Sequence, residues 1–207
     1  MYSRAFQLMV KTKNIRICEI VSGAVNRVSE GEVIQLLNIH DTTVDEKRYF
    51  EVIERKTGVL FEAAARMGAT IGGATKEEEE KLTQYALALG TAFQIIDDVL
   101  DYRGDEEKTG KALGADLREG KMTMPLIYAL RKCSDEEAKE IKEAVKQGEG
   151  DLNSITRILE ETGAIEECAI TAKQIVSSGI DAISFLKPSL YKESLVKLLS
   201  LTVERDL

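Results

Sequence analysis

The amino-acid sequence predicts an all-α protein from three observations. Among 207 residues there are only 2 prolines and no tryptophan, while Ala, Glu, Leu and Lys, which favour helices, are frequent. No stretch alternates apolar and polar residues as a strand would. Ser or Thr is followed three residues later by Glu at several points, a helix-start signature. No linker or repeat interrupts the pattern, so residues 1–207 are expected to form a single all-α domain.

The helices are bounded by start and stop signals along the chain. Capping boxes are predicted at Thr43–Glu46, Thr75–Glu78 and Ser134–Glu137, because each Ser or Thr can accept an N–H bond and each Glu can reach back. Gly72-Gly73 and Gly148 are expected to end helices. The expected helices cover about 2–11, 12–39, 44–71, 76–103, 122–132, 135–147, 151–162, 164–186 and 189–204.

Composition excludes several classes of partner. The net charge of −8, from 28 basic and 36 acidic residues, disfavours nucleic acid and acidic membranes, which need a basic face. Cys18, Cys133 and Cys168 show neither metal-ligand spacing nor the pattern of a secreted domain, so we expect a cytoplasmic protein. No signal peptide and no apolar run long enough to span a bilayer is evident.

The N-terminus has the pattern of a helix interior. Met1 to Val10 carry an amphipathic pattern without a capping residue or a polar first turn, although helices usually begin with both. We therefore expect that N-terminal helices are missing ahead of this segment.

The segment from 94 to 101 is the most informative part of the chain. Gln94, Asp97, Asp98 and Asp101 share one helix face, because residues three and four apart are neighbours. Such carboxylates repel one another, and magnesium reverses that repulsion by binding one or two carboxylates together with phosphate oxygens. The apolar residues around them favour burial, with the acidic stripe facing a cavity. The alternative is an ordinary solvated acidic stripe.

Two further segments place lysines near this stripe. Gly110 and Gly114 permit backbone close to a ligand, and Lys111 and Lys121 can reach phosphate oxygens. The alternative is a surface loop of mixed charge. Lys56, within a predicted helix with small residues after it, either points into a cavity or is solvated, and its residue pattern alone leaves both open.

As a set, these residues resemble the trans-polyprenyl diphosphate synthases, and most closely the long-chain, octaprenyl diphosphate synthase type. The resemblance covers essentially the whole chain. It rests on Lys56-Thr57, Phe93-Gln94-x-x-Asp97-Asp98-x-x-Asp101, Gly110-Lys111 and Gly114-x-Asp116-x-x-Glu119-Gly120-Lys121.

This resemblance implies an isoprenoid-synthase-type helical bundle around a central cavity. It implies a prenyltransferase that binds an allylic diphosphate through Mg²⁺, ionises it, and condenses the cation with isopentenyl diphosphate with loss of a proton. Metals and lysines neutralise the departing diphosphate in such enzymes. The implied metal ligands are Asp97, Asp98 and Asp101, with Asp97 as the principal one. The implied diphosphate-binding residues are Lys56, Lys111 and Lys121, and the implied catalytic residues are Lys56, Thr57 and Gln94.

The chain departs from the family pattern at its N-terminal side. The family has an earlier aspartate-rich motif followed by Arg-Arg, and a Gly-Lys, His and Arg that bind isopentenyl diphosphate. Here Asp97-Asp98 is the only Asp-Asp pair and no Arg-Arg occurs; the single histidine, His40, is expected to be a surface residue. We therefore expect one half-site that does not turn over on its own and that is completed by a missing N-terminal segment or a partner chain.

The sequence leaves three hypotheses for the function of this chain. The first is part of a synthase, and the second is a non-catalytic regulatory partner of a full-length prenyl synthase. The third is a helical terpene cyclase, for which the Glu119-Gly120-Lys121 loop is less suited. Because missing helices would expose apolar faces, we also expect a homo-oligomer or another association.

Overall fold

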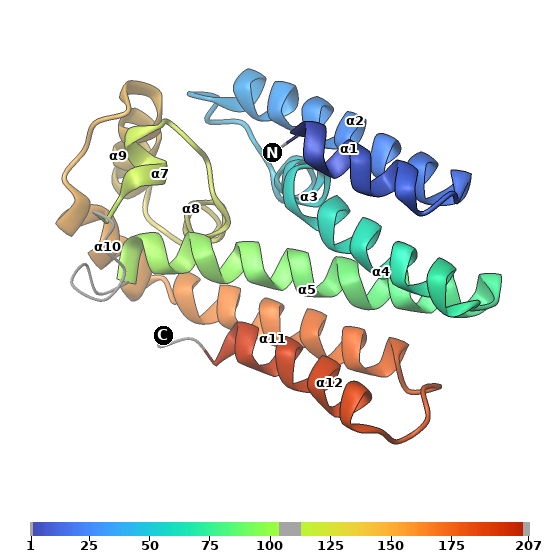
Figure 1. Ribbon diagram of the computed structural model, residues 1–207. Coiled ribbons are helices and arrows are strands. Elements are labelled where there is room, and N and C mark those ends of the chain that lie inside the picture. Colours follow the sequence, from blue (N-terminus) through green and yellow to red (C-terminus); the bar gives the residue numbers. More distant parts are fainter. Residues whose placement is uncertain (1, 104–112, 205–207) are drawn as a thin grey trace.

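The computed structural model describes residues 2–103 and 113–204, and these parts contain helices and no strand (Figure 1). The all-α prediction is confirmed for them. The elements are α1 (Tyr2–Lys11), α2 (Ile15–Asn38), α3 (Glu46–Ile53), a π-helical turn (Glu54–Gly58), α4 (Val59–Gly72), α5 (Lys76–Arg103), α7 (Ala115–Arg118), α8 (Met124–Ala129), α9 (Asp135–Gln147), α10 (Leu152–Glu161), α11 (Ala164–Ala182) and α12 (Leu190–Val203).

Helix α5 forms the centre of the bundle. Helix α4 packs along one side of it and α11 along the opposite side, while α2 covers α4 and α12 covers α11 (Figure 1). The short helices α7 to α10 gather around the C-terminal end of α5. This arrangement places residues of four separate segments around the acidic part of α5.

The sequence of α5 explains its central place. Ala92, Ile95, Ile96 and Val99 have no exposed surface, and, because they are three and four residues apart, they form one apolar face of α5 away from the acidic stripe. An apolar helix face is stable only when neighbouring helices cover it. Burying one side chain of this size contributes about 1.5–3 kcal/mol, so α10 and α11 are held firmly against α5.

Two glycines let the π-helical turn lie directly on α5. A Cβ atom on Gly90 would come within 2.8 Å of the Gly58 Cα and 2.9 Å of the Phe61 ring. Gly90 has no room for a larger residue, because real Cβ contacts are not this short, whereas a Cβ on Gly58 would meet its nearest atom at 3.4 Å. The close approach brings Lys56 and Thr57 next to the polar face of α5.

Two of the three predicted capping boxes form. Thr75 and Glu78 exchange hydrogen bonds at the start of α5, and Ser134 and Glu137 do so at the start of α9. Gly73 and Gly148 end helices with φ of 70° and 68°, in the left-handed region that glycine adopts at low cost. These predictions are confirmed.

The prediction of a capping box at Thr43 is wrong. The Thr43 hydroxyl and N–H both donate to Asp41, and Asp45 caps α3 by accepting from the Arg48 N–H at 2.9 Å. An aspartate is as good a cap as threonine, so the local turn at Asp41 decides between them.

The long helix expected over 44–71 is also interrupted. The π-helical turn Glu54–Gly58 separates α3 from α4. Such turns are rare and occur frequently at functional sites. Helix propensity carries no signal for one, because every residue of the turn is also compatible with α-helix.

The segment after α5 differs from the expected loop. Residues 115–118 form the short helix α7, and the helix expected at 122–132 is the shorter α8. Pro125 lies in the first turn of α8, where its missing N–H has no cost.

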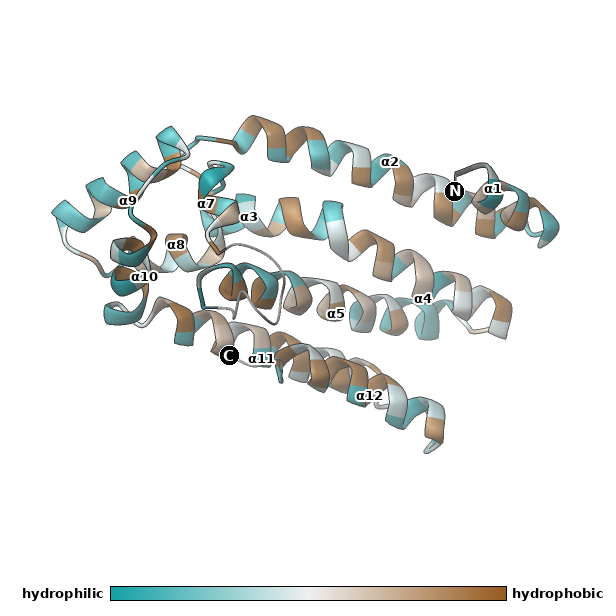
Figure 2. Ribbon diagram, turned by 60° about the vertical axis from the view of Figure 1, so that its left-hand side comes forward, coloured by the Kyte–Doolittle hydropathy of each residue, from teal (hydrophilic) through white to brown (hydrophobic). Residues whose placement is uncertain are grey.

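No helix in the described ranges is long and apolar enough to cross a membrane. Hydrophobic residues nevertheless occur along α1 and α2 (Figure 2), and several of them are exposed. Ile15 and Leu37 are 75% and 74% exposed, and Phe6 is 58% exposed.

The glycine contact provides a test of the packing. We expect Gly90→Ala to lower the free energy of unfolding by about 1–3 kcal/mol, because the new methyl group collides with Gly58 and Phe61. The matched control is Gly68→Ala, on the open side of α4 with nothing within 4 Å. It should raise stability by about 0.5–1 kcal/mol through helix propensity. Urea unfolding measures both, and equal effects of the two variants would contradict the close approach.

Candidate active site

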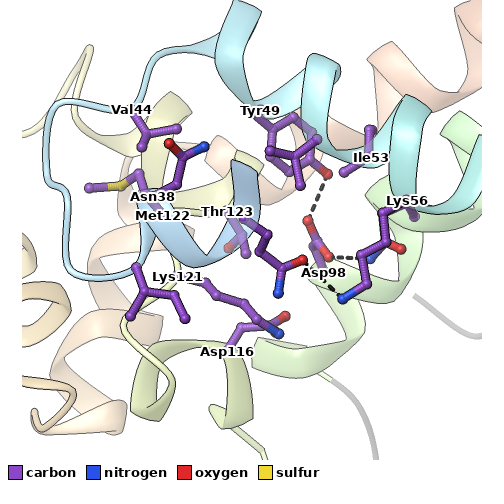
Figure 3. Close-up of a pocket in the computed structure, with 14 residues that line it drawn as sticks. Asn38, Val44, Tyr49, Ile53, Lys56, Asp98, Asp116, Lys121, Met122 and Thr123 are labelled. Atoms are coloured by element: carbon purple, nitrogen blue, oxygen red, sulfur yellow. Dashed lines mark hydrogen bonds and ion pairs between the residues drawn. The ribbon is translucent and has the colours of Figure 1, made fainter. Parts of the chain in front are cut away.

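A cavity of about 600 Å³, including its open mouth, lies beside the acidic face of α5. Its walls come from α2, α3, the π-helical turn, α5, α7 and the residues before α8 (Figure 3). The lining combines an apolar side, formed by Val44, Val52, Ile53 and Met122, with a polar side. The polar side contains Gln35, Asn38, Tyr49, Lys56, Gln94, Asp98, Asp116, Lys121 and Thr123.

Lys56 lines this cavity, which decides the alternative that the residue pattern left open. Its ammonium group donates to the Gln35 Oε1 at 2.9 Å and pairs with Glu32 at 3.3 Å. The π-helical turn aims the side chain toward α2 and the cavity. Its partners are a neutral amide and a half-exposed carboxylate, both weak competitors for a strongly charged anion.

Lys121 is the second cation of the cavity. Its ammonium group lies 2.8 Å from Asp116 and 2.6 Å from Glu119, and Figure 3 shows it beside Asp116. Burial opposes the charge on Lys121, but the hydrogen bonds to the two carboxylates outweigh burial and raise its pKa. Lys121 is therefore positively charged at neutral pH.

Asp98 is buried at the base of the cavity, with only 3% of its surface exposed. The Tyr49 hydroxyl donates to its Oδ2 at 2.6 Å, and the Gln94 amide donates to its Oδ1 at 2.8 Å (Figure 3). Burial raises the pKa of Asp98 to about 8, and the charge on Asp116 acts in the same direction, while the two hydrogen bonds act against them. Burial also raises the pKa of Tyr49, so its phenol keeps the proton that it donates.

The other two aspartates of the stripe have different surroundings. Asp101 accepts the N–H groups of Ala115 and Asp116 at 3.0 and 2.9 Å, and its partial burial raises its pKa. Asp97 is half-buried, and within the described ranges no side chain or N–H group donates to it. The three carboxylates thus share a helix face, but they do not converge: no group of three possible metal ligands occurs in the part of the chain that the structure describes.

Thr57 and Gln94 lie together as the helix positions suggested. The Thr57 hydroxyl donates to the Gln94 Oε1 at 3.2 Å. Gln94 lines the cavity, and Thr57 lies behind it. Lys111, expected to bind diphosphate, and Gly110 fall outside the described residues.

Residue patterns missed two members of the site. No sequence pattern marks Tyr49, because its partner Asp98 is 49 residues away. Asp116 fitted a surface loop as well as a cavity, yet it lines the cavity and holds Lys121. In both cases only the tertiary fold shows the contact.

His40 lies in the connection between α2 and α3, as expected, but it has a defined place. Its ring Nδ1 lies 2.9 Å from the Val145 carbonyl oxygen, and its backbone N–H donates to the Gly120 carbonyl oxygen at 2.8 Å. A Cβ on Gly120 would come within 2.3 Å of the His40 ring. His40 therefore fixes the loop that carries Lys121.

An all-α bundle of this arrangement, with lysines and aspartates around a cavity beside a buried central helix, defines the isoprenoid-synthase class of folds. The family model of the polyprenyl synthetases matches residues 1–162, and the chain belongs to this family. The resemblance inferred from the motifs is thereby confirmed.

Individual relatives agree with this assignment. The chain is 41% identical to octaprenyl diphosphate synthase of Escherichia coli (strain K12) over 99% of its own length. It is 36% identical to the all-trans-nonaprenyl-diphosphate synthase (geranyl-diphosphate specific) of Rhodobacter capsulatus over 98% of its length. Among solved structures, it superposes with a TM-score of 0.93, at 34% identity, on a polyprenyl synthase from Caulobacter crescentus CB15 complexed with calcium and isoprenyl diphosphate, covering 99% of this chain and 63% of that one. The chain spans 64% and 62% of the lengths of the first two relatives.

The raised pKa of Asp98 makes a prediction about stability and pH. The folded protein keeps a proton on Asp98 up to about pH 8, whereas the unfolded chain releases it near pH 3.8. The contribution of the Asp98 proton to the free energy of unfolding is therefore fully present below pH 3.8 and is lost as the pH rises through about 8. Relative to Asp98→Asn, which has no such proton, the wild-type protein should lose stability between about pH 5 and pH 8. Urea unfolding across this range without magnesium measures the difference, and a pH-independent difference would exclude a buried, titrating Asp98.

Proposed function

We propose that this chain is part of a trans-polyprenyl diphosphate synthase and carries its second aspartate-rich half-site. In this proposal an allylic diphosphate binds in the cavity and is condensed with isopentenyl diphosphate once the site is complete. The observation that carries the proposal is the polar side of the cavity, where Lys56, Lys121, Gln94 and Asp98 meet beside an apolar wall. Such a cavity suits a ligand with an anionic head and a greasy tail.

The two lysines support binding of the anionic head. Each holds only carboxylate or amide partners that are at least partly exposed, and a diphosphate carries more charge than either partner. Lys56 reaches the cavity from the π-helical turn, and Lys121 reaches it from the loop fixed by His40. Two cations from separate segments can bind one diphosphate from two sides, and we assign Lys111 to the same role.

The carboxylates fit magnesium through Asp97. Magnesium keeps several waters and takes one or two carboxylates together with phosphate oxygens, so a carboxylate without other partners is the most suitable ligand. Asp97 meets that requirement, whereas Asp98 and Asp101 have both oxygens occupied. We propose Asp97 as the direct ligand, with Asp98 and Asp101 beside it. Bound Mg²⁺ would supply electrostatic stabilisation of the leaving diphosphate.

Gln94 and Thr57 are proposed to face the carbon that becomes cationic. The Gln94 amide lines the cavity, and its oxygen is held by the Thr57 hydroxyl. Oriented carbonyl dipoles stabilise developing positive charge without reorganising during the reaction. The apolar wall excludes water, which would otherwise trap the cation.

The product is proposed to be a long trans-polyprenyl chain of the octaprenyl type. The 41% identity to the octaprenyl enzyme supports this choice, although the nonaprenyl enzyme is 36% identical. Chromatography of the product made by the completed enzyme tests it, and a different dominant chain length would contradict the octaprenyl assignment.

The chain is also proposed to associate, with itself or with a segment or chain that completes it. The exposed apolar residues of α1 and α2 support association, because contiguous apolar surface is usually covered. Sedimentation velocity at several concentrations tests this, and a monomer throughout would contradict it. The three cysteines are free, which supports a reducing, cytoplasmic location that fractionation of cells can check.

The binding prediction tests the half-site directly. Calorimetric titration of farnesyl diphosphate into this chain should show binding with magnesium, and none in EDTA. Asp97→Ala should abolish the magnesium-dependent part, because the direct ligand is lost. Asp181→Ala, an exposed aspartate on α11, is the matched control and should bind normally. Equal binding with and without magnesium would contradict the proposed site.

A second prediction concerns turnover. The purified chain, incubated with farnesyl diphosphate, isopentenyl diphosphate and magnesium, should form no elongated product. One aspartate-rich half-site does not position the whole diphosphate. Radiolabelled isopentenyl diphosphate makes the assay sensitive. Elongation by the chain alone would contradict this prediction and show that the half-site is sufficient. If the chain instead stimulates a full-length synthase, and alanine variants of its site residues stimulate equally well, a regulatory role would be favoured.

A further inference from the structure

Tyr49 lines the cavity and holds the Asp98 carboxyl group from outside α5. It is 5% exposed, lies on α3, and donates its hydroxyl to the Asp98 Oδ2 at 2.6 Å. Its ring is packed edge-to-face with Phe50, with centroids 5.7 Å apart. The ring and the hydroxyl therefore have separate roles, one in packing and one in the polar network.

The hydroxyl begins a chain of hydrogen bonds that runs through Asp98 and Gln94 to Thr57. Tyr49 fixes one oxygen of Asp98, and the Gln94 Nε2 donates to the other at 2.8 Å. The Gln94 Oε1 then accepts from the Thr57 hydroxyl at 3.2 Å. An amide has donors only on its nitrogen and lone pairs only on its oxygen, so the side of Gln94 that faces Asp98 decides which side faces away.

We propose that Tyr49 is a positioning residue that, acting through Asp98, holds the Gln94 amide with its nitrogen on Asp98 and its oxygen on the Thr57 hydroxyl. This inference rests on the proposed function for its purpose, because Gln94 lines the cavity, where an amide oxygen favours a cationic carbon and an N–H group would oppose it. The geometry itself stands without that function. No ion pair to Asp98 exists among the described residues that could fix the carboxylate in place of Tyr49.

The first test measures the amide directly. Tyr49→Phe removes the hydroxyl and keeps the ring, and Tyr85→Phe is the matched control, since Tyr85 is equally buried and donates to the Leu195 carbonyl at 2.9 Å. The side-chain N–H₂ resonances of Gln94, identified by their loss in Gln94→Glu, should shift in Tyr49→Phe and stay in place in Tyr85→Phe. Unchanged Gln94 resonances in Tyr49→Phe would overturn the proposal whether or not the chain binds a ligand.

The second test compares probes with and without a positive charge in the hydrocarbon chain. One is farnesyl thiodiphosphate, whose chain is uncharged, and the other is an ammonium analogue of the farnesyl cation with inorganic pyrophosphate, both with magnesium. Tyr49→Phe should weaken binding of the ammonium analogue about tenfold, as expected for an interaction with a charged group. Binding of the thiodiphosphate should change by less than about twofold, since Gln94 contacts no charge on it.

The two tests separate the proposals. Equal weakening of both probes would mean that Tyr49 acts only in packing, which overturns the positioning role. Urea midpoints of the two tyrosine variants show whether either change reflects loss of folding. If the wild-type chain binds neither probe, the proposed function fails, and the Gln94 resonances still decide whether Tyr49 sets the amide.

Discussion

The buried carboxylate of Asp98 imposes the constraint on which the site depends. Only 3% of the surface of Asp98 is exposed, so its hydrogen bonds come mainly from protein groups. A buried carboxylate without partners is costly, and the two donors come from Tyr49 and Gln94. One donor lies on α3, so satisfying Asp98 also fixes α3 against α5. The π-helical turn that follows α3 is thereby held over the cavity.

The three aspartates of the stripe share one helix face, but their carboxyl groups have different hydrogen-bond partners. Asp98 is occupied by side chains, and Asp101 by the N–H groups at the start of α7. Asp97 is left with its oxygens unoccupied among the described residues. Repetition along a helix face thus produces one carboxylate that ties α3 to α5, one that holds the following loop, and one whose oxygens have no hydrogen-bond donor among the described residues. The family's acidic motif is therefore also a structural motif.

Features set by neighbouring residues were predictable from the sequence, and features set by distant ones were not. The caps at Thr75 and Ser134 depend on residues three positions apart, and both form. The cap at Thr43 failed because Asp41 and Asp45 compete within the same five residues. Lys56 was ambiguous until the π-helical turn fixed its direction, and Tyr49 and Asp116 acquire roles only through contacts across the fold. Gln94 and Asp98 line the cavity, as helical spacing and heavy apolar flanking predict for the acidic stripe, whereas Asp97 and Asp101 are not among the residues that line it.

The π-helical turn between α3 and α4 behaves as a spacer with one surplus residue. Deleting one residue from Glu54–Gly58 would let the two helices continue as a regular α-helix and turn α3 by about 100° relative to α4. Tyr49 would then leave Asp98, although no residue of the site had been substituted. This segment is consequently more sensitive to the loss of a codon than to most single replacements, and alignments of related sequences should carry no gap across it.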